Sequence, residues 1–196
     1  MVIWINGAFG SGKTQTANEI CRRLEGAFLY DPENAGYFLR KNEPLALQAE
    51  NFQDEPLWRE INFHLLRRIA TEYDGTVVVP MTLICAEYYH QIISALRQEG
   101  IQVFHVVLSA SRKVLLHRLH SRLEGRNSWA AHQIEGCMAA FENPLFEHKI
   151  NTDTLTIPEV AERVAQYCNV QLKPRQGGAL RQYASRVITQ MRYIRK

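Results

Sequence analysis

The sequence predicts an α/β fold in which a parallel five-stranded sheet carries helices on both faces. Three observations support this prediction. Short apolar segments alternate along the chain with longer segments whose apolar residues recur at helical spacing. The short segments are rich in Val and Ile and lack polar alternation, which is typical of parallel strands buried on both sides. A glycine-rich loop joins the first short segment to the first helical one, as expected at the ligand edge of such a sheet.

The first strand is predicted at residues 2–5 and the first helix at 13–24. Between them lies Gly7-Ala8-Phe9-Gly10-Ser11-Gly12-Lys13-Thr14, which fits the phosphate-loop pattern G-x-x-x-x-G-K-[ST] without a mismatch. Glycines let backbone N–H groups turn toward a phosphate, and the helix adds unpaired N–H groups and its positive dipole end. We expect Lys13 to contact the β- and γ-phosphates of ATP and Thr14 to ligate Mg²⁺. A glycine turn without ligand is the alternative, and the strand–loop–helix context favours nucleotide binding.

The remaining elements continue the alternation. Strands are predicted at 26–30, 76–79 and 101–108, with a short edge element beginning at Ile150. Helices are predicted at 33–41, 57–71 (Leu57, Ile61, Leu65 and Ile69 on one face), 86–98, after Ser109 as helix cap, from the polar break 124–128 through Phe141, and from the capping box Thr156-Ile157-Pro158-Glu159 to about Tyr167. Residues 43–56 are expected to form a loop with helical turns. The chain therefore predicts a P-loop NTPase fold.

Length and composition indicate one globular domain at residues 1–170 followed by a basic tail at 171–196. Of 196 residues 46% are hydrophobic and 22% charged, and no apolar run approaches the roughly 20 residues that span a membrane. The first strand begins at once, so no signal peptide is expected, and the four cysteines show neither zinc nor disulfide spacing. We therefore expect a cytoplasmic protein.

The tail has a distinct charge. It carries seven basic residues and no acid, so within an overall charge of +3 the first 170 residues carry −4. Apolar residues of the tail recur at helical spacing, which predicts an amphipathic helix. Residues 173–196 are thus a candidate for contact with an anionic membrane at its inner face, and packing on the domain is the equally weighted alternative. Nucleic acid is not expected as a partner, because only the tail would suggest it.

Ligands of open parallel sheets bind at the carboxyl ends of the strands. Asp31 directly follows the second strand and could accept a proton from a substrate hydroxyl or hold a Mg²⁺-bound water. An aspartate that starts a turn before Pro32 is the alternative, and both stay open. The third strand ends in Pro80-Met81-Thr82 without the acid of hydrolytic P-loop ATPases, and there is no N-K-x-D guanine signature. This absence favours a small phosphotransferase over a motor ATPase or a GTPase.

Arginines supply further candidates. Arg118 and Arg122 share a helix face and Arg126 follows in the polar break, where guanidinium groups could bind phosphate oxygens across a closing lid. A solvated basic face is the alternative. Four more residues are candidates for contact with the substrate, although surface charge or core packing also explains them: Arg40, Trp58, Arg59 and Thr82.

Five blocks of sequence resemble the TmrB family of tunicamycin-resistance proteins, and the resemblance extends from Val2 through the tail. The blocks are residues 3–17, 30–33 (Tyr-Asp-Pro-Glu), 56–59 (Pro-Leu-Trp-Arg), 79–82 (Val-Pro-Met-Thr) and 127–131 (Asn-Ser-Trp-Ala-Ala). The resemblance implies an ATP-binding domain similar to nucleoside-monophosphate kinases and small antibiotic phosphotransferases. It also implies that Asp31 acts as base or Mg²⁺ organiser, that Arg118 and Arg122 clamp phosphates, and that the substrate is tunicamycin, an acylated nucleoside antibiotic.

Two functions follow from the residues and the resemblance together. The first is ATP-dependent phosphorylation of a hydroxyl on a nucleoside antibiotic, with Lys13, Thr14, Asp31 and the lid arginines as the machinery. The second is ATP-dependent binding that sequesters the drug without modifying it. Both confer antibiotic resistance, and they differ in whether the drug gains a phosphate.

Overall fold

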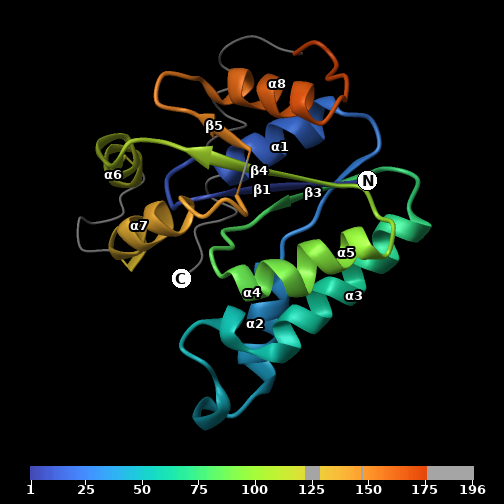
Figure 1. Cartoon of the computed structure of the whole chain (residues 1–196), viewed down its shortest axis with the longest axis vertical. Coiled ribbons are helices and arrows are strands. Elements are labelled where there is room, and N and C mark those ends of the chain that lie inside the picture. The colour runs from blue at the N-terminus through green and yellow to red at the C-terminus, as the bar shows by residue number, and fades with distance from the viewer. Residues whose placement is uncertain (122–128, 147, 176–196) are drawn as a thin grey trace.

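The computed structural model describes residues 1–121, 129–146 and 148–175. Within these ranges the strands form one parallel five-stranded sheet in the order β2-β3-β1-β4-β5 (Figure 1). The strands are β1 (Val2–Gly7), β2 (Ala27–Leu29), β3 (Thr76–Pro80), β4 (Val103–Ser109) and β5 (Lys149–Asn151). Val2 lies opposite Val77 on one side and Val103 on the other, so β1 is the central strand. The predicted sheet is confirmed, including its short edge strand at Ile150.

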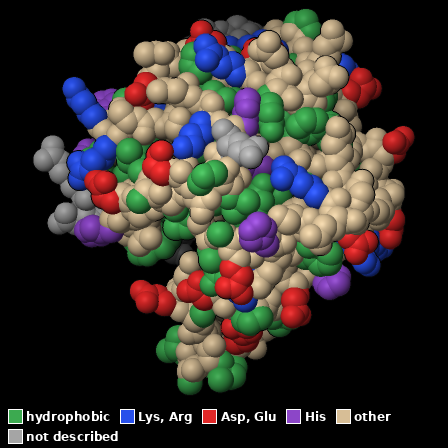
Figure 2. All heavy atoms as spheres, viewed as in Figure 1, with side chains coloured by type: hydrophobic (Ala, Val, Ile, Leu, Met, Phe, Trp, Pro, Cys, Tyr) green, Lys and Arg blue, Asp and Glu red, His purple; other side chains and the backbone are tan. Residues whose placement is uncertain are grey.

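Helices cover both faces of the sheet, as predicted (Figure 1). Helices α1 (Lys13–Arg23) and α8 (Ile157–Tyr167) pack on one face. The other face carries α2 (Glu33–Asn42), the short helices η1 (Leu45–Leu47) and η2 (Phe52–Asp54), α3 (Pro56–Glu72), α4 (Ala86–Tyr89), η3 (His90–Ser94), α5 (Ala95–Gln98), α6 (Arg112–His120) and α7 (Trp129–Ala140). Side chains of both charges are spread over the face shown in Figure 2, and acidic ones gather in its lower half.

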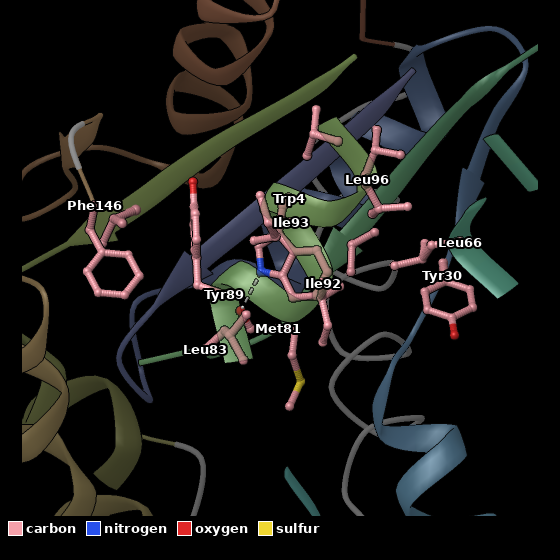
Figure 3. Packing of buried hydrophobic residues seen from close by; sticks show 14 of the residues in the cluster. Trp4, Tyr30, Leu66, Met81, Leu83, Tyr89, Ile92, Ile93, Leu96 and Phe146 are labelled. Atoms are coloured by element: carbon pink, nitrogen blue, oxygen red, sulfur yellow. Dashed lines mark hydrogen bonds between the residues drawn. The ribbon is translucent and has the colours of Figure 1, made fainter. Parts of the chain in front are cut away.

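The period-two alternation of β1 assigns its side chains to two cores. Ile3 and Ile5 pack toward α1 and α8, whereas Val2 and Trp4 pack toward the other helices. All four are 0% exposed. The indole N–H of Trp4 donates to the carbonyl oxygen of Met81 at 3.2 Å (Figure 3), so this large aromatic is buried without an unpaired donor. The first strand is therefore fixed from both sides.

Helix α3 buries a different face from the one that its leucines suggest. Trp58, Asn62 and Leu66 are fully buried, whereas Leu57 and Leu65 are more than 40% exposed. Asn62 is satisfied in the core because its amide oxygen accepts a hydrogen bond from the Tyr30 hydroxyl at 2.8 Å. Of the predicted stripe, Leu65 and Ile69 line a surface hollow next to β2.

Two local predictions need correction. The helix predicted at 86–98 contains a five-residue π-turn, η3, between α4 and α5. Ser109 ends β4 and does not cap a helix; Ser111 is the N-cap residue of α6, without a side-chain bond to the helix. The backbone N–H of Ser111 donates to the Asp153 carboxylate at 2.7 Å, so an acid from the loop before α8 lies at the N-terminus of α6. The capping box of Thr156 and Glu159 is confirmed.

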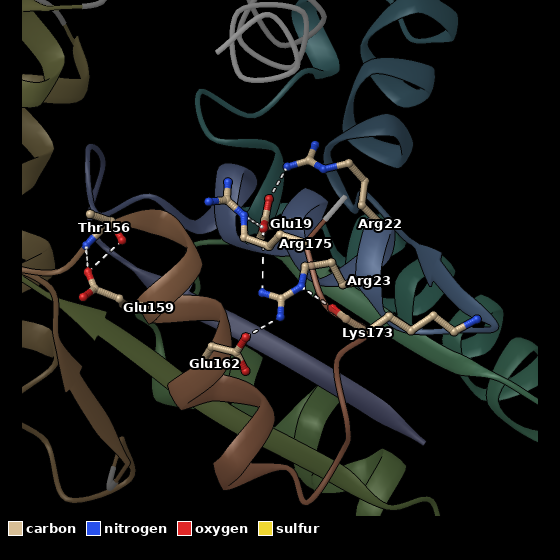
Figure 4. A network of polar contacts seen from close by, with 8 residues as sticks. All are labelled: Glu19, Arg22, Arg23, Thr156, Glu159, Glu162, Lys173 and Arg175. Carbon is tan, nitrogen blue, oxygen red and sulfur yellow. Dashed lines mark hydrogen bonds and ion pairs between the residues drawn. The ribbon is translucent and has the colours of Figure 1, made fainter. Parts of the chain in front are cut away.

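The first residues of the tail pack on the domain. The backbone N–H of Lys173 donates to the carbonyl oxygen of Arg23, and the Arg23 side chain donates back to the Lys173 carbonyl, each at 2.8 Å (Figure 4). Arg175 adds an ion pair with Glu19 at 2.9 Å. The rest of the predicted amphipathic helix lies outside the described residues. Among those that are described, no helix is both long and apolar enough to cross a bilayer.

Candidate functional site

The glycine loop has a geometry that only glycine permits. Gly7, Gly10 and Gly12 have φ angles of +143°, +83° and +100°, which side chains rarely tolerate. A Cβ on Gly7 would lie 2.5 Å from the carbonyl oxygen of Leu108, and one on Gly10 would lie 2.8 Å from that of Leu115. The loop thus packs closely against the end of β4 and against α6, and a side chain at Gly7 or Gly10 would collide with them.

A buried polar network fixes the start of the loop. Asn6 is 0% exposed, and its amide oxygen accepts hydrogen bonds from the N–H groups of Gly7 and Leu83 at 2.8 and 2.9 Å. Its amide nitrogen donates to the carbonyl oxygen of Leu83 and lies 3.1 Å from Nε2 of His105. Burial, with the charge of Arg97 adding to it, lowers the pKa of His105 to about 3, so the imidazole is neutral and Nε2 can accept. One asparagine therefore joins the end of β1 to the segment after β3 and to the interior of β4.

The ammonium of Lys13 rests on the loop itself. It donates to the carbonyl oxygens of Gly7 and Ala8 at 2.9 and 3.1 Å and lies 5.4 Å from the centroid of the Phe9 ring. The Thr82 hydroxyl also donates to the carbonyl oxygen of Gly7, at 2.9 Å. Thr82 thus contacts the loop from the end of β3, where other P-loop proteins carry an acid.

The residues of this loop fit a Mg²⁺-nucleotide. Gly12 is the N-cap of α1 and offers no side-chain acceptor, and the first turn contains no acid, so the helix N-terminus keeps its positive potential for an anion. Among the described residues the buried Ser11 hydroxyl has no hydrogen-bond partner, which is unusual for a buried polar group. Thr14, in the first turn of α1, is half-buried and in the position that ligates Mg²⁺ in such loops.

Asp31 starts the turn that leads into α2. Its carboxylate accepts a hydrogen bond from the N–H of Glu33 at 3.0 Å, so the turn interpretation is confirmed. The indole N–H of Trp58 holds the same turn through the carbonyl oxygen of Pro32 at 3.0 Å. Trp58 is fully buried and positions this turn, and its predicted contact with a substrate stays a prediction. A chemical role of Asp31 remains a prediction, and the half-buried side chain is compatible with it.

An apolar hollow of about 520 Å³ adjoins Asp31. It runs along the open edge of β2 under α2 and α3. Its walls include Phe28, Phe38 and Leu65, which are 47%, 61% and 41% exposed. Asp31 and Asn34 are the polar residues of the lining. The carboxylate therefore lies where an apolar surface meets the ligand edge of the sheet.

The other predicted residues are distributed around this edge. Arg118 donates to the hydroxyl of Thr152 at 3.0 Å and to its carbonyl oxygen at 2.6 Å, which anchors α6 to the end of β5. Arg122 and Arg126 lie outside the described residues. The structure therefore places one of the three predicted lid arginines, next to the loop that precedes α8.

Arg59 and Arg40 order the segment between α2 and α3. Arg59 donates to the carbonyl oxygen of Gln53 at 2.6 Å and stacks over the Tyr88 ring at 4.3 Å. The Gln53 amide donates in turn to the carbonyl oxygen of Thr82 at 2.9 Å, so a chain of contacts joins Arg59 to the end of β3. Arg40 donates to the carbonyl oxygen of Glu50 in the same segment. Their predicted contacts with substrate stay predictions.

Two features of the site were not predicted. In the sequence, Asn6 and His105 look like ordinary strand residues. Their role becomes visible only in the fold, where Asn6 contacts Leu83 and His105, which are 77 and 99 positions further along the chain. The second feature is an aromatic pair, Phe9 and Trp129, with ring centroids 5.1 Å apart and planes at 75°. The signal for this pair was present, since Trp129 follows the predicted lid and Phe9 belongs to the loop.

Comparison with known proteins agrees with this geometry. A family model described as an AAA domain matches residues 2–144. The structure of a tunicamycin resistance protein from Deinococcus radiodurans is similar, with a TM-score of 0.76 and 31% sequence identity. The similarity covers 89% of this chain and 98% of that one. The chain belongs to the tunicamycin-resistance family of AAA-domain proteins. No curated protein sequence matches it.

More distant structures share the fold of this tunicamycin-resistance family member. A gluconokinase from Sinorhizobium meliloti has a TM-score of 0.60 at 18% identity and covers 86% of this chain and 91% of its own. The APS kinase of Mycobacterium tuberculosis, solved with AMPPNP and APS, has a TM-score of 0.56 at 19% identity, with 86% and 96% covered. The family member thus has the fold of nucleotide-binding, kinase-like P-loop proteins.

Proposed function

We propose that the protein transfers the terminal phosphate of ATP to a hydroxyl of a nucleoside antibiotic of the tunicamycin type. The observation that carries this proposal is a loop that fits the phosphate-loop pattern and has positive φ angles at its glycines, in a chain that is 31% identical to a tunicamycin resistance protein over 89% of its length. The half-buried carboxylate of Asp31 at the same edge of the sheet supports a transfer reaction, because it offers a base near the loop.

In this proposal the predicted site residues, of which Arg122 lies outside the described part of the chain, have separate roles. Lys13 and the loop N–H groups hold the triphosphate, and Thr14 would ligate a Mg²⁺ ion that neutralises charge on the β- and γ-phosphates. Asp31 accepts the proton of the acceptor hydroxyl as its oxygen bonds to the terminal phosphorus. The bond from that phosphorus to the bridging oxygen breaks, and ADP leaves. Arg118, with Arg122, stabilises the charge that develops on the transferred group.

The apolar hollow beside Asp31 supports the choice of acceptor. An acylated drug needs a surface for its hydrocarbon as well as a carboxylate near its hydroxyl, and this part of the structure offers both. Small polar acceptors would gain nothing from Phe28, Phe38 and Leu65.

A second function is ATP-dependent binding of the drug without modification. The observation that favours it is the end of β3, where Pro80-Met81-Thr82 provides no carboxylate and Thr82 bonds to the loop instead. Organisation of Mg²⁺ then depends on Thr14 and Asp31, and one Asp31 oxygen is engaged by the turn. Binding of a nucleotide does not require the alignment that transfer requires.

Mass spectrometry of the drug separates the two functions. Tunicamycin is incubated with the protein, ATP and Mg²⁺, alongside reactions without ATP and with the Lys13→Ala variant. A gain of one phosphate in the complete reaction alone supports transfer. Unmodified drug that binds to the protein only when ATP is present, as measured by calorimetry, supports sequestration and contradicts transfer.

A further inference from the structure

The exposure of Trp129 sets it apart from the other tryptophans. The chain has three, and Trp4 and Trp58 are 0% exposed, whereas Trp129 is 60% exposed. It is the first residue of α7 and makes a T-shaped contact with the Phe9 ring. A large aromatic held by one ring and exposed on its remaining surface offers a π-face on which a base can stack.

The position of Phe9 says which part of a bound nucleotide lies nearby. The Lys13 ammonium lies 5.4 Å from the centroid of the Phe9 ring, and the lysine of such a loop contacts the β- and γ-phosphates. The terminal phosphate therefore lies on the side of the loop where Phe9 and Trp129 meet.

The nucleoside end of ATP lies on the opposite side. The start of α1 cradles the phosphates nearer the nucleoside, and there a Cβ on Gly12 would lie 3.2 Å from the Ile157 side chain of α8. Thr152, which binds Arg118, precedes the same helix. Helix α8 therefore borders the start of α1, whereas Trp129 of α7 borders Phe9. The two ends of a bound nucleotide would then face different helices, which leaves Trp129 to the acceptor.

We propose that Trp129 is an acceptor-binding residue whose exposed surface stacks on the base of the nucleoside acceptor while Phe9 holds the indole. This inference rests on the proposed function, because it assigns a contact to the acceptor. Base–aromatic stacking tolerates different bases and needs no hydrogen bond, so an exposed indole is enough to provide it. The stacking orients the acceptor beside the terminal phosphate and adds affinity that a non-aromatic side chain cannot supply.

Collisional quenching of tryptophan fluorescence by iodide tests the contact without relying on turnover. Trp4 and Trp58 are inaccessible to the quencher, so the quenchable signal belongs to Trp129. We expect tunicamycin to lower the quenching constant of the wild-type protein at least twofold and ADP to leave it nearly unchanged. The Trp129→Phe variant, which keeps the buried tryptophans, shows the background.

Affinity measurements distinguish stacking from a structural role. Trp129→Ala is expected to weaken tunicamycin binding about tenfold or more, while Trp129→Phe, which keeps an aromatic ring, restores most of it. Affinity for ATP and the melting temperature should change little in both variants. Matching losses in the two variants, or a loss of ATP affinity, would show that Trp129 only supports the loop.

The quenching experiment also keeps this inference separate from the proposed function. If the drug gains a phosphate but leaves the quenching constant unchanged, the proposed function holds and the Trp129 contact is wrong. If ADP protects as well as the drug does, Trp129 stacks on the nucleotide and the inference is wrong. If the wild-type protein does not bind the drug at all, both are wrong.

Discussion

The ammonium of Lys13 lies 2.9 Å from the carbonyl oxygen of Gly7, the residue that opens the same loop. It is also 3.1 Å from the carbonyl oxygen of Ala8. Phosphate oxygens carry charge and bind an ammonium more strongly than neutral carbonyl oxygens do. A phosphate that enters the loop would therefore compete with Gly7 and Ala8 for the ammonium at the place where it now lies.

Replacement of Lys13 by Ala should remove nucleotide binding and leave the fold intact. The variant loses the cation expected to pair with the β- and γ-phosphates, whereas the carbonyl oxygen of Gly7 keeps its hydrogen bond from the Thr82 hydroxyl. Calorimetry with ATP and a melting curve check this expectation, with Lys41→Ala on the exposed side of α2 as the matched control. Wild-type ATP affinity in a folded Lys13→Ala variant would contradict the assignment of the site.

Replacement of Asp31 by Asn should abolish transfer and preserve ATP binding. The amide oxygen can still accept the hydrogen bond from the N–H of Glu33, so the turn stays in place, but it cannot take up a proton. We expect turnover to fall by about 100-fold or more, as for loss of a general base. Asp74→Asn, in the exposed turn before β3, is the control. If Asp31→Asn turns over at the wild-type rate, Asp31 is a turn residue only.

Arg118→Ala should lower turnover more than ATP affinity, because charge on the transferred group develops in the transition state. The bonds to Thr152 allow another explanation, in which the arginine only anchors α6 to the end of β5. The variant Thr152→Val removes one of these bonds and leaves the guanidinium in place, so it should keep most of the activity. An equal loss of rate in both variants, or an equal loss of rate and ATP affinity in Arg118→Ala, argues against a transition-state role. Arg112→Ala, at the exposed start of α6, is a control for charge.

The sequence alone predicts the sheet and the phosphate loop because both depend on local features. Apolar β-branched segments are typical of buried parallel strands, and glycines at fixed positions allow the backbone conformations that a phosphate loop needs. The buried face of α3 could not be predicted in this way. Leu57 and Leu65 are more hydrophobic than Asn62, yet Trp58 and Asn62 face the core. There they form hydrogen bonds with Pro32 and Tyr30, which lie in the connection between β2 and α2. Long-range partners of this kind, like those of Asn6, decide which face of an element is buried.

The pair of Glu19 and Arg175 should make stability depend on pH. Burial alone would raise the pKa of Glu19, but the hydrogen bonds and charges of Arg22 and Arg175 outweigh it and hold the pKa below its ordinary value of 4.5. The carboxylate therefore contributes stability that is present above pH 4.5 and is lost as the pH falls through the lower, folded-state pKa.

Glu19→Gln should consequently lower the free energy of unfolding by about 1 kcal/mol at pH 7, because the partly buried donors of Arg22 and Arg175 lose a charged acceptor and solvent screens part of the effect. The difference from wild type should shrink as the pH falls below 4.5. Urea denaturation at several pH values measures both effects. Glu72→Gln, whose ion pair with Arg68 is exposed, should change stability by no more than the error of the measurement. A difference for Glu19→Gln that is independent of pH would show that packing, and not charge, carries the effect.

The tail should bind anionic membrane through the residues that follow Arg175. Leu180, Ala184, Val187, Met191 and Ile194 recur at helical spacing in a segment without acids, which is the composition of an interfacial helix. Because residues 171–175 are bound to α1, deletion of 176–196 removes the proposed helix and leaves the ion pair of Arg175 with Glu19 intact. We expect the full chain to co-sediment with anionic vesicles at low salt and to be released at high salt, since attraction to the surface is screened. The truncated chain should stay in the supernatant. Equal sedimentation of the two chains, or none of the full chain, would instead mean that the apolar stripe packs against the protein.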